Sequence, residues 1–485
     1  MYNKASYATI VKYTVNSYHQ MDGWNFEIYF RELFSQKAIC CGTLYIVLKY
    51  KYMEIIKRHR VVKGEYEMLL KNLHIMNFKM FEDLNLQFKP GFNLILGDNG
   101  VGKTSVLEAA TVAVSGFLTG MEDIPTRNIY KDDIHYNIIV NNNGTFDRSY
   151  CYPVEIESTI SYAGTDYTWN RTKISSRTTI SPKDILMVSR DLINSTERKI
   201  LPLISYQSAS RHWISARKDA NEKKRKQLHN RRCGYLGCLD RTANLNVINN
   251  WCEQMEWSSV RMNSIAENYE QFGKIVSKFM SIMNDGLISK VVYQPNEGKL
   301  LYSENGKFKD IDYLSAGYQS LLNLILDLAY RMAILNPDEG ENISKVEGIV
   351  FIDEIDSNLH PKWQWRVVDA LTEIFPNIQF IAATHSPIIV SSCKDANIIN
   401  LDENGNVRYI TDSYAFSVND ILRDMLGYHM RPAKVENLIE EFEKRMDREE
   451  YDDAKKAMDQ LIVLLGERHP QSIALKSEYE IEAEE

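Results

Sequence analysis

The stretch Gly97-Asp98-Asn99-Gly100-Val101-Gly102-Lys103-Thr104-Ser105 decides the fold of this chain of 485 residues. Its glycines allow a tight turn whose backbone N–H groups point at phosphate oxygens, as in a phosphate-binding loop. Lys103 is expected to reach the β- and γ-phosphates, and Thr104 to hold Mg²⁺. The residues expected to bind ATP are Asp98, Asn99, Gly100, Val101, Gly102, Lys103, Thr104 and Ser105.

The residues on either side of this loop supply the setting that it needs. Residues 92–96 form an apolar run that predicts a strand, and residues 105–110 predict the start of a helix. A helix N-terminus would then face the phosphates. The loop pattern alone would arise by chance in roughly one chain of this length in fifty, given the usual frequency of glycine. The flanking elements therefore favour a real nucleotide site.

A second apolar run, residues 348–352, ends in the acids Asp353 and Glu354. Continuous hydrophobic runs are typical of buried parallel strands. Asp353 is expected to hold Mg²⁺ together with Thr104, and Glu354 to polarise the attacking water as a catalytic residue. The alternative is a core strand that ends at a solvated acidic turn, which the phosphate loop upstream disfavours.

A third motif precedes the acid pair. Residues 314–319 resemble the signature sequence of ABC-type ATPases, which acts in trans on the γ-phosphate bound by a partner subunit. Ser315 is also a plausible N-cap of the following helix. Ala316 and Tyr318 depart from the commonest form of the motif. The signature residues are Ser315, Ala316, Gly317, Tyr318 and Gln319.

Two further motifs follow the acid pair. Residues 355–361 resemble the D-loop of the same superfamily, in which Asp356 would couple two nucleotide sites. A strand predicted at 378–383 leads to His385, where ABC-type ATPases keep a histidine that contacts the γ-phosphate. A lone histidine at a strand end is usually only solvated. Because His385 follows Asp353 and Glu354 in the order and spacing of these motifs, we interpret it instead as a γ-phosphate contact. Lys103, Glu354 and His385 are the expected catalytic residues.

Gln207 is the expected Mg²⁺-sensing glutamine, because it follows the apolar run 200–204. An exposed glutamine after a strand is equally ordinary, so both interpretations stay open.

The bulk properties of the chain indicate a cytoplasmic protein of two or three lobes. No run of 18 apolar residues that could cross a membrane is present, and the seven cysteines show no metal-ligand spacing. Residues 433–485 hold 16 acids and 8 bases, which accounts for the whole net charge of −8. A basic run could contact DNA or be a solvated loop; its members are Arg217, Lys218, Lys223, Lys224, Arg225 and Lys226.

The chain is expected to divide into three parts: an N-terminal extension of unknown role at 1–66, an ATPase domain at 67–432 and an acidic helical module at 433–485. Within the ATPase domain we expect two opening strands at 69–75 and 84–88, a strand-rich insertion at 120–200, a basic and helical lid or arm at 205–290, and two strands within 291–311. The module reads as helices at 433–446, 450–465 and 470–482, and either docks a basic partner or caps the body.

Residues 314–337 and 348–387, with the segments 206–213, 232–240 and 418–422 and the acidic tail, resemble the ATPases of Septu-type and retron-associated anti-phage defence systems. Residues 77–81 resemble the opening of RecF-like and SMC-like ATPases. The resemblance implies an α/β P-loop domain of the ABC type, with ATP and Mg²⁺ as cofactors. Ser357 and Asn358 depart from the D-loop that the family would predict, and residues 1–66 have no counterpart.

The same resemblance implies partners. These would be a second copy in a homodimer that assembles further, a separate HNH nuclease subunit of the PtuB type and, in the retron branch, a reverse transcriptase with its RNA–DNA hybrid. The main alternative is a RecF-like repair ATPase that binds DNA directly. A self-sufficient nuclease is disfavoured, because only 100 residues, mostly helical in pattern, follow His385.

Overall fold

The computed structural model describes residues 68–483, apart from 143, 176–182, 195–198, 210–229, 241–244, 411–412, 415, 426 and 428–430. The chain divides into two units at Glu65 and Tyr66, and the description below concerns the second. The expected N-terminal extension and the six basic residues Arg217, Lys218, Lys223, Lys224, Arg225 and Lys226 lie outside the described residues.

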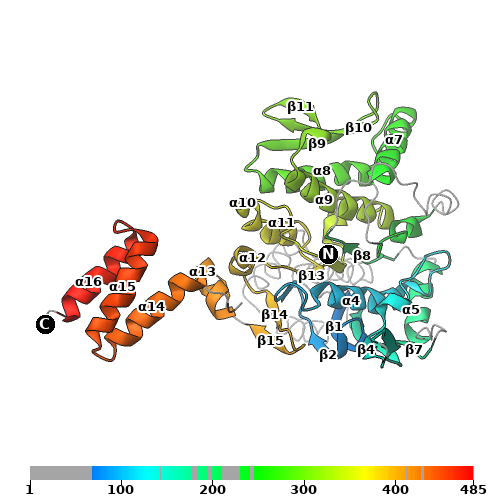
Figure 1. Cartoon of the computed structure of the whole chain (residues 1–485). Helices are drawn as coiled ribbons and strands as arrows, with labels where there is room; N and C mark the ends of the chain where they lie inside the picture. Colours follow the sequence, from blue (N-terminus) through cyan, green and yellow to red (C-terminus); the bar gives the residue numbers. More distant parts are fainter. Residues whose placement is uncertain are drawn as a thin grey trace, which may run out of the picture. The chain divides into compact units, whose positions relative to one another are not determined.

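A six-stranded sheet forms the centre, in the order β15-β14-β3-β13-β12-β8 (Figure 1). Five strands are parallel and β15 is antiparallel. The parallel strands are short and almost wholly buried, as apolar runs in a sheet covered on both faces should be. Their bounds are β3 Phe92–Leu96, β8 Leu203–Gln207, β12 Gly348–Ile352, β13 Ile378–Ala383 and β14 Asn397–Leu401, with β15 at Val407–Ile410. The expected strands at 92–96, 348–352 and 378–383 are confirmed.

A second, antiparallel sheet has the order β2-β1-β6-β7. Helix α4 (Lys103–Leu118) contacts strands of both sheets, which explains why nearly all its residues are buried. The stretch expected to be an insertion at 120–200 therefore completes this sheet with β6 and β7. The strands are β1 Met68–Phe78, β2 Phe81–Gln87, β6 Val154–Tyr162 and β7 Thr165–Lys173. The separate hairpin of β4 (Tyr136–Val140) and β5 (Phe146–Tyr150) lies between β2 and β6 in the chain, and α5 spans Lys183–Asn194.

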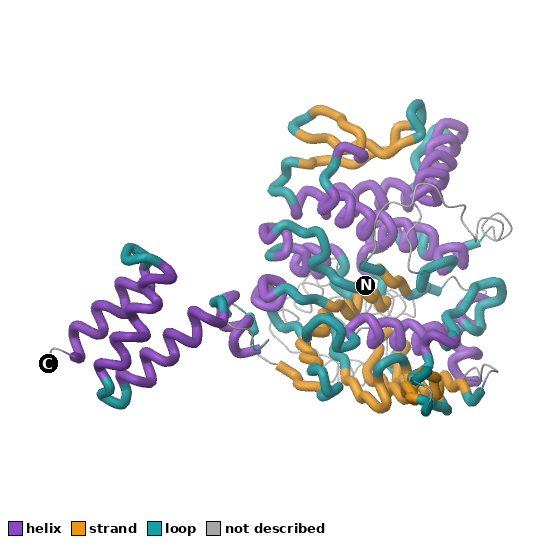
Figure 2. Tube along the Cα trace, in the orientation of Figure 1, coloured by secondary structure: helices purple, strands orange, loops and turns teal. Residues whose placement is uncertain are grey.

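Helix α9 (Ala316–Leu335) contacts β8 of the central sheet and helix α8 (Glu267–Met283), so it covers the face opposite α4 (Figures 1 and 2). Helix α7 (Leu245–Met262) joins this layer through Trp251, whose ring lies 5.1 Å from Phe272 and 5.4 Å from Tyr330. The residues before α9 form three strands where two were expected, because the second run turns back at Asn305 and Gly306, both at positive φ. They are β9 Ile288–Gln294, β10 Lys299–Glu304 and β11 Lys307–Asp310.

Short helices line the end of the central sheet where its parallel strands finish. They are α10 (Pro361–Gln364) and α11 (Val367–Ile374) between β12 and β13, and α12 (Pro387–Ser392) after β13, followed by α13 (Val418–Asp420). Short 3₁₀ helices occur at Lys131–Asp133, Arg231–Tyr235, Ile311–Tyr313 and Gly340–Lys345, and a short π-helix at Ile421–Met425.

Three C-terminal helices carry a hydrophobic cluster of their own. Helices α14 (Ala433–Met446), α15 (Tyr451–Leu465) and α16 (Pro470–Ala483) follow the expected bounds to within one residue. Ala454, Ala457, Met458 and Leu461 are buried among Phe442 and its neighbours, as the i, i+3, i+4 spacing predicts. The module therefore has its own small core, separate from the main hydrophobic cluster.

Candidate nucleotide-binding site

The glycine-rich loop joins β3 to α4, as the sequence predicts. Gly100 and Gly102 have φ of 88° and 98°, in the left-handed region that residues with a Cβ rarely adopt. A Cβ on Gly102 would also collide with the sulfur of Met80 and the ring of Phe81. Asn99 and Gly100 are exposed at the tip. The loop thus offers backbone N–H groups and a helix N-terminus to an anion, and the fit to a phosphate chain is good.

The ammonium group of Lys103 is folded into this loop. It donates to the carbonyl oxygens of Gly97 at 2.8 Å and Asp98 at 2.7 Å, and lies 3.3 Å from Nδ1 of His385. The side chain is only 6% exposed, and burial lowers the pKa of Lys103 despite the opposing charges of Asp98 and Asp353. The structure therefore brings two of the expected catalytic residues, Lys103 and His385, to the same place.

Thr104 and Asp353 meet at the neighbouring position. The hydroxyl of Thr104 lies 3.1 Å from both carboxylate oxygens of Asp353, although 249 residues separate them. Both belong to segments that end or begin at the same edge of the central sheet, since β12 runs parallel to β13 and β13 to β3. A hydroxyl and a carboxylate are oxygen donors of the kind that Mg²⁺ prefers.

Glu354 follows directly and is half-buried, with φ of 45°. A non-glycine residue in this region is strained, and such strain is concentrated at active sites. Two residues on, Asp356 accepts a hydrogen bond from the Thr384 hydroxyl at 2.5 Å and one from the backbone N–H of His385 at 3.3 Å. The D-loop acid thus fixes the turn that carries His385.

That turn is also fixed from its other side. The hydroxyl of Ser386 caps helix α12 by accepting from the N–H groups of Ile388 and Ile389, and donates to the side-chain oxygen of Gln364 at 2.7 Å. Pro387 occupies the favoured first helical position. These contacts hold His385 between the phosphate loop and the D-loop.

The signature residues begin helix α9. Ser315 is the N-cap residue by backbone position, but its hydroxyl makes no capping hydrogen bond and the residue is exposed. A Cβ on Gly317 would lie 2.5 Å from the carbonyl oxygen of Asn358 and 2.7 Å from the ring of Trp363. Trp363 also contacts Tyr318, with ring centroids 4.2 Å apart. The signature turn is therefore packed on the D-loop segment, while its serine faces outward.

Gln207 is not brought to the Thr104–Asp353 pair. It lies opposite Ile352 in the register of β8 and β12, so its side chain shares the face of Ile352, and Asp353 points to the other face. Its amide nitrogen donates to Asp327 at 2.7 Å and to Ser205 at 2.8 Å on the α9 side. The side chain of Gln207 therefore bonds Asp327 and Ser205 in this structure, and its place among the Mg²⁺ ligands stays a prediction.

Two features near the site were not expected from the sequence. Asp327 and Arg331 form a buried ion pair at 2.8 Å, and Arg331 also donates to the carbonyls of Gly234, Leu236 and Gly237. The sequence does carry a signal for this ion pair, because two opposite charges stand four residues apart in an otherwise apolar helical run. Trp363, which packs on the signature turn, carried no comparable signal because its partner lies in a distant segment.

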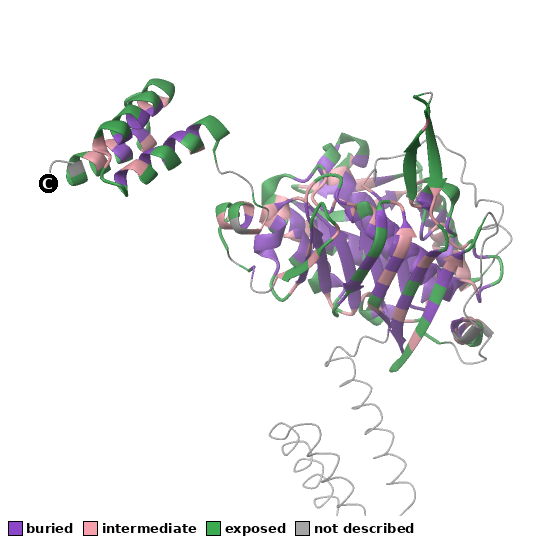
Figure 3. Ribbon diagram, turned by 60° about the horizontal axis from the view of Figure 1, so that its bottom comes forward, coloured by how far each residue is buried: buried purple, intermediate pink, exposed green. Residues whose placement is uncertain are grey.

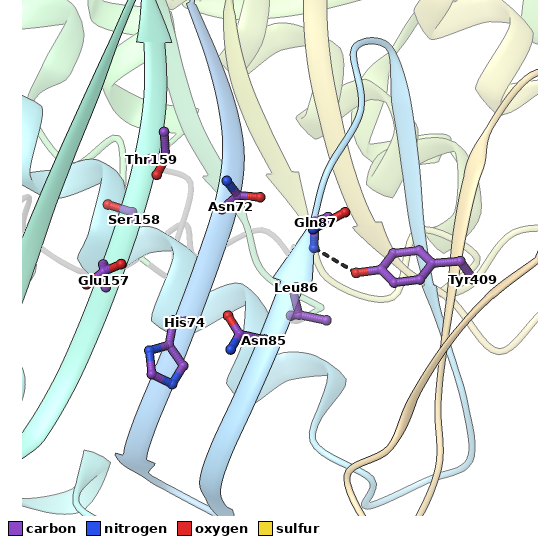
Figure 4. Close-up of a pocket in the computed structure, with 9 residues that line it drawn as sticks. All are labelled: Asn72, His74, Asn85, Leu86, Gln87, Glu157, Ser158, Thr159 and Tyr409. Atoms are coloured by element: carbon purple, nitrogen blue, oxygen red, sulfur yellow. Dashed lines mark hydrogen bonds between the residues drawn. The ribbon is translucent and has the colours of Figure 1, made fainter.

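A polar hollow of about 430 Å³ lies elsewhere, on the outer face of strands β1, β2 and β6 (Figure 4). Side chains from three adjacent strands point into it, and the hydroxyl of Tyr409 accepts from the N–H of Gln87 at 2.7 Å at one end. None of the expected nucleotide-site residues lines this hollow, so it is distinct from the phosphate loop.

This loop, the acid pair and the histidine define a nucleotide-hydrolysing site of the P-loop class. Comparison with known families agrees: an AAA domain model matches residues 72–283, and an AAA ATPase domain model matches residues 190–390. Both matches support ATP hydrolysis by this chain, whose fold is α/β with a mixed central sheet flanked by helices.

Relatives then refine the class. The protein named Retron Vc95 probable ATPase, from Vibrio cholerae serotype O1 biovar El Tor, is 28% identical and covers 69% of this chain and 73% of its own length. The Septu protein PtuA of Bacillus thuringiensis is 26% identical, covering 84% of this chain and 97% of that protein. The DNA double-strand break repair Rad50 ATPase of Archaeoglobus fulgidus is 32% identical over 28% of this chain and 13% of its own length. The resemblance to Septu and retron ATPases is confirmed.

None of the helices within the described part of the chain is both long and apolar enough to span a membrane.

Proposed function

We propose that this chain is the ATP-binding and ATP-hydrolysing subunit of an anti-phage defence complex, which controls an associated HNH nuclease through nucleotide-dependent dimerisation. The observation that carries the proposal is a site divided between two surfaces. Lys103, Thr104, Asp353 and His385 converge at one, while the exposed hydroxyl of Ser315 opens the signature helix without capping it. A signature serine that faces solvent is suited to a nucleotide held by a second copy.

Each residue then has a role. Lys103 would release the carbonyl oxygens of Gly97 and Asp98 and bind the β- and γ-phosphates. His385, which lies beside Lys103, would contact the γ-phosphate. Thr104 and Asp353 would hold Mg²⁺, which neutralises charge on the phosphate oxygens when bound. Glu354 would orient and deprotonate the attacking water.

Asp356 and Gly317 would transmit the nucleotide state of one site of the dimer to the second site. Asp356 holds the turn of His385, and the D-loop residue Asn358 contacts Gly317 of the signature turn. A shift of the D-loop on dimerisation would therefore move both a γ-phosphate contact and the surface offered to the partner. ATP would in this way hold a dimer together, and hydrolysis would loosen it.

The experiment compares Glu354→Gln with Lys103→Ala by light scattering coupled to size exclusion, with and without ATP and Mg²⁺. Glu354→Gln is expected to bind ATP and accumulate as a dimer, because the hydrolytic base is lost and the phosphate contacts are kept. Lys103→Ala is expected to lose nucleotide binding and to show no ATP-induced dimer. A Glu354→Gln protein that stays monomeric at saturating ATP would contradict the proposal that two copies share each nucleotide site.

The nuclease part has its own test. The tagged chain is purified from its native operon, with and without residues 433–485, and associated proteins are identified by mass spectrometry. An HNH protein that accompanies the full chain and is absent after the deletion supports both the nuclease partner and the acidic module as its docking site. A reverse transcriptase in the same complex would place the chain in the retron branch.

A DNA-repair ATPase that binds DNA directly is the second candidate, favoured by the partial similarity to the Rad50 ATPase. Its expected outcome in the same purification is an ATPase without a nuclease partner, bound to DNA.

A further inference from the structure

The β4–β5 hairpin is exposed along nearly its whole length. Every residue of β4 is exposed, and β5 is exposed up to its last residue, Tyr150. In Figure 3 these strands appear as a pair of exposed ribbons that stand out from the buried body. They form a two-stranded sheet of their own, and such hairpins are marginally stable without a partner.

One face of this hairpin is apolar and aromatic. The antiparallel register places Tyr136 opposite Tyr150, Ile138 opposite Arg148, and Val140 opposite Phe146, all on one side of the ribbon. Ile138 is 62% exposed, Val140 64% and Phe146 71%. Four apolar side chains left in water on one small face need an explanation, because contiguous exposed apolar patches mark interaction sites.

Two cations contact the pair of tyrosine rings on this face, one at each ring. The ammonium of Lys131 lies 5.2 Å from the ring centre of Tyr150, whose ring is 5.9 Å from that of Tyr136. The guanidinium of Arg148 lies 4.6 Å from the ring centre of Tyr136 on the far side. Among the described residues, neither Lys131 nor Arg148 has a carboxylate partner. Both cations therefore remain available to an anionic ligand.

Strand β7 carries two buried cations. Arg171 and Lys173 of β7 are buried, and their hydrogen-bond acceptors are the carbonyls of Arg127 and Ile129 and the amide of Asn128. No carboxylate in the described part of the chain neutralises them. The nearby acids include Asp132, Asp133, which pairs with Arg127, Asp147, which lies on the opposite face of the hairpin, and Glu82, which lies 3.7 Å from Nε2 of His135 at its base. The aromatic face itself presents Lys131 and Arg148, and none of its strand positions holds an acid.

The base of the hairpin is held by the body. The N–H of His135 donates to the carbonyl of Asn77 at 2.9 Å, and its ring nitrogen Nδ1 lies 2.7 Å from the carbonyl oxygen of Lys79. The N–H of Cys151 donates to the carbonyl of His135 at 2.8 Å. The hairpin is therefore held by the body at the end where Tyr136 and Tyr150 meet. These contacts do not reach the other end, which carries Phe146.

We propose that this face binds single-stranded nucleic acid, with bases stacked on Tyr136, Tyr150 and Phe146 and phosphates paired with Lys131 and Arg148. Stacking platforms flanked by cations are how proteins hold single strands without reading their sequence. The face is about 14 Å long, from the rise of a five-residue antiparallel strand, so it accommodates only a few nucleotides. A protein partner would use the same apolar area, but would not need a cation at each of the two tyrosine rings.

The test measures binding of a fluorescein-labelled oligodeoxythymidine to the full chain by fluorescence anisotropy, over a range of salt concentrations. Phe146→Ala and Tyr136→Ala are each expected to weaken binding by about tenfold, which is the loss of one stacked base. Arg148→Ala is expected to weaken binding and to flatten its salt dependence. Tyr136→Phe keeps the ring and is expected to bind as the unsubstituted chain does.

Ile139→Ala is the matched control, because Ile139 is 50% exposed on the opposite face of the same strand. The proposal is overturned if Phe146→Ala and Tyr136→Ala bind the oligonucleotide as tightly as Ile139→Ala. It is also overturned if Phe146→Ala leaves oligonucleotide binding intact and releases a protein that co-purifies with the unsubstituted chain. Circular dichroism and ATP hydrolysis without nucleic acid verify that the variants are folded, since none of these residues contacts the phosphate loop.

Discussion

The hydroxyl of Thr104 lies 3.1 Å from each carboxylate oxygen of Asp353. Thr104 lies in the first turn of helix α4, and Asp353 directly follows strand β12, far along the chain. Their meeting turns two local sequence motifs into one potential metal site.

Thr104→Val is expected to reduce Mg²⁺-dependent ATP hydrolysis on the order of 100-fold, because a bound metal supplies several kcal/mol of charge stabilisation. The substitution removes the hydroxyl at nearly constant volume. The measurement is the rate of phosphate release as a function of Mg²⁺ concentration. Thr104→Ser is the control, since it retains the oxygen; equal rates for the two variants would show that this hydroxyl does not hold the metal.

Gly317→Ala is expected to slow hydrolysis at saturating ATP by about tenfold, with a small effect on ATP affinity. Its Cβ would lie 2.5 Å from the carbonyl oxygen of Asn358, so the signature turn or the D-loop has to move, whereas the phosphate loop is not touched. Hydrolysis and calorimetric ATP binding are measured side by side.

Gly273→Ala serves as the comparison for that prediction. Gly273 also lies in a helix, and a Cβ there would meet nothing within 4 Å. If Gly317→Ala hydrolyses ATP as fast as Gly273→Ala, the close packing of the signature turn on the D-loop is not needed for turnover.

Arg331→Met is expected to lower the free energy of unfolding by about 3–5 kcal/mol, because it leaves Asp327 buried without its countercharge. The side chains of Arg331 and Asp327 are only 6% and 7% exposed. The variant also removes the donor to the carbonyls of Gly234 and Leu236. Urea unfolding followed by circular dichroism gives the change in stability.

An exposed pair provides the reference for that experiment. Arg423, 61% exposed, pairs with Asp420 at 3.2 Å, and Arg423→Met is expected to change stability by less than about 1 kcal/mol. A similar small loss for Arg331→Met would mean that water reaches the Asp327 carboxylate.

Cys238 and Cys393 are expected to resist alkylation by iodoacetamide in the folded protein at pH 8. Burial raises the pKa of each thiol to about 12, so roughly one thiol in ten thousand is a thiolate at that pH. Cys151 and Cys233 are partly exposed and are expected to react before these two buried thiols. Peptide mass spectrometry after timed labelling distinguishes the sites, and rapid modification of Cys238 before Cys151 would contradict this account.

Much of the site follows from local sequence. A phosphate loop needs glycines in the left-handed backbone region directly before a helix. The acid pair in turn needs a position directly after an apolar strand. Each of these patterns lies within a few neighbouring residues. Three strands of the central sheet, β3, β12 and β13, and the three C-terminal helices were predicted for the same reason. Hydrophobic periodicity and terminal residues decide such elements locally.

The relations between segments were decided by the tertiary structure. Parallel pairing of β3, β13 and β12 sets Lys103 beside His385 and Thr104 beside Asp353. One step of strand alternation turns Gln207 toward Asp327 and away from the metal position. Pairing of β6 with β1 makes a supposed insertion part of a sheet.

The sequence by itself therefore determined which chemistry this protein carries, because the motif residues act through their own neighbours in the chain. The tertiary structure decided which of them share a site and which surface is left for a ligand. Strand register and side-chain direction depend on distant pairing partners, and a change of one residue reverses the face that a side chain occupies.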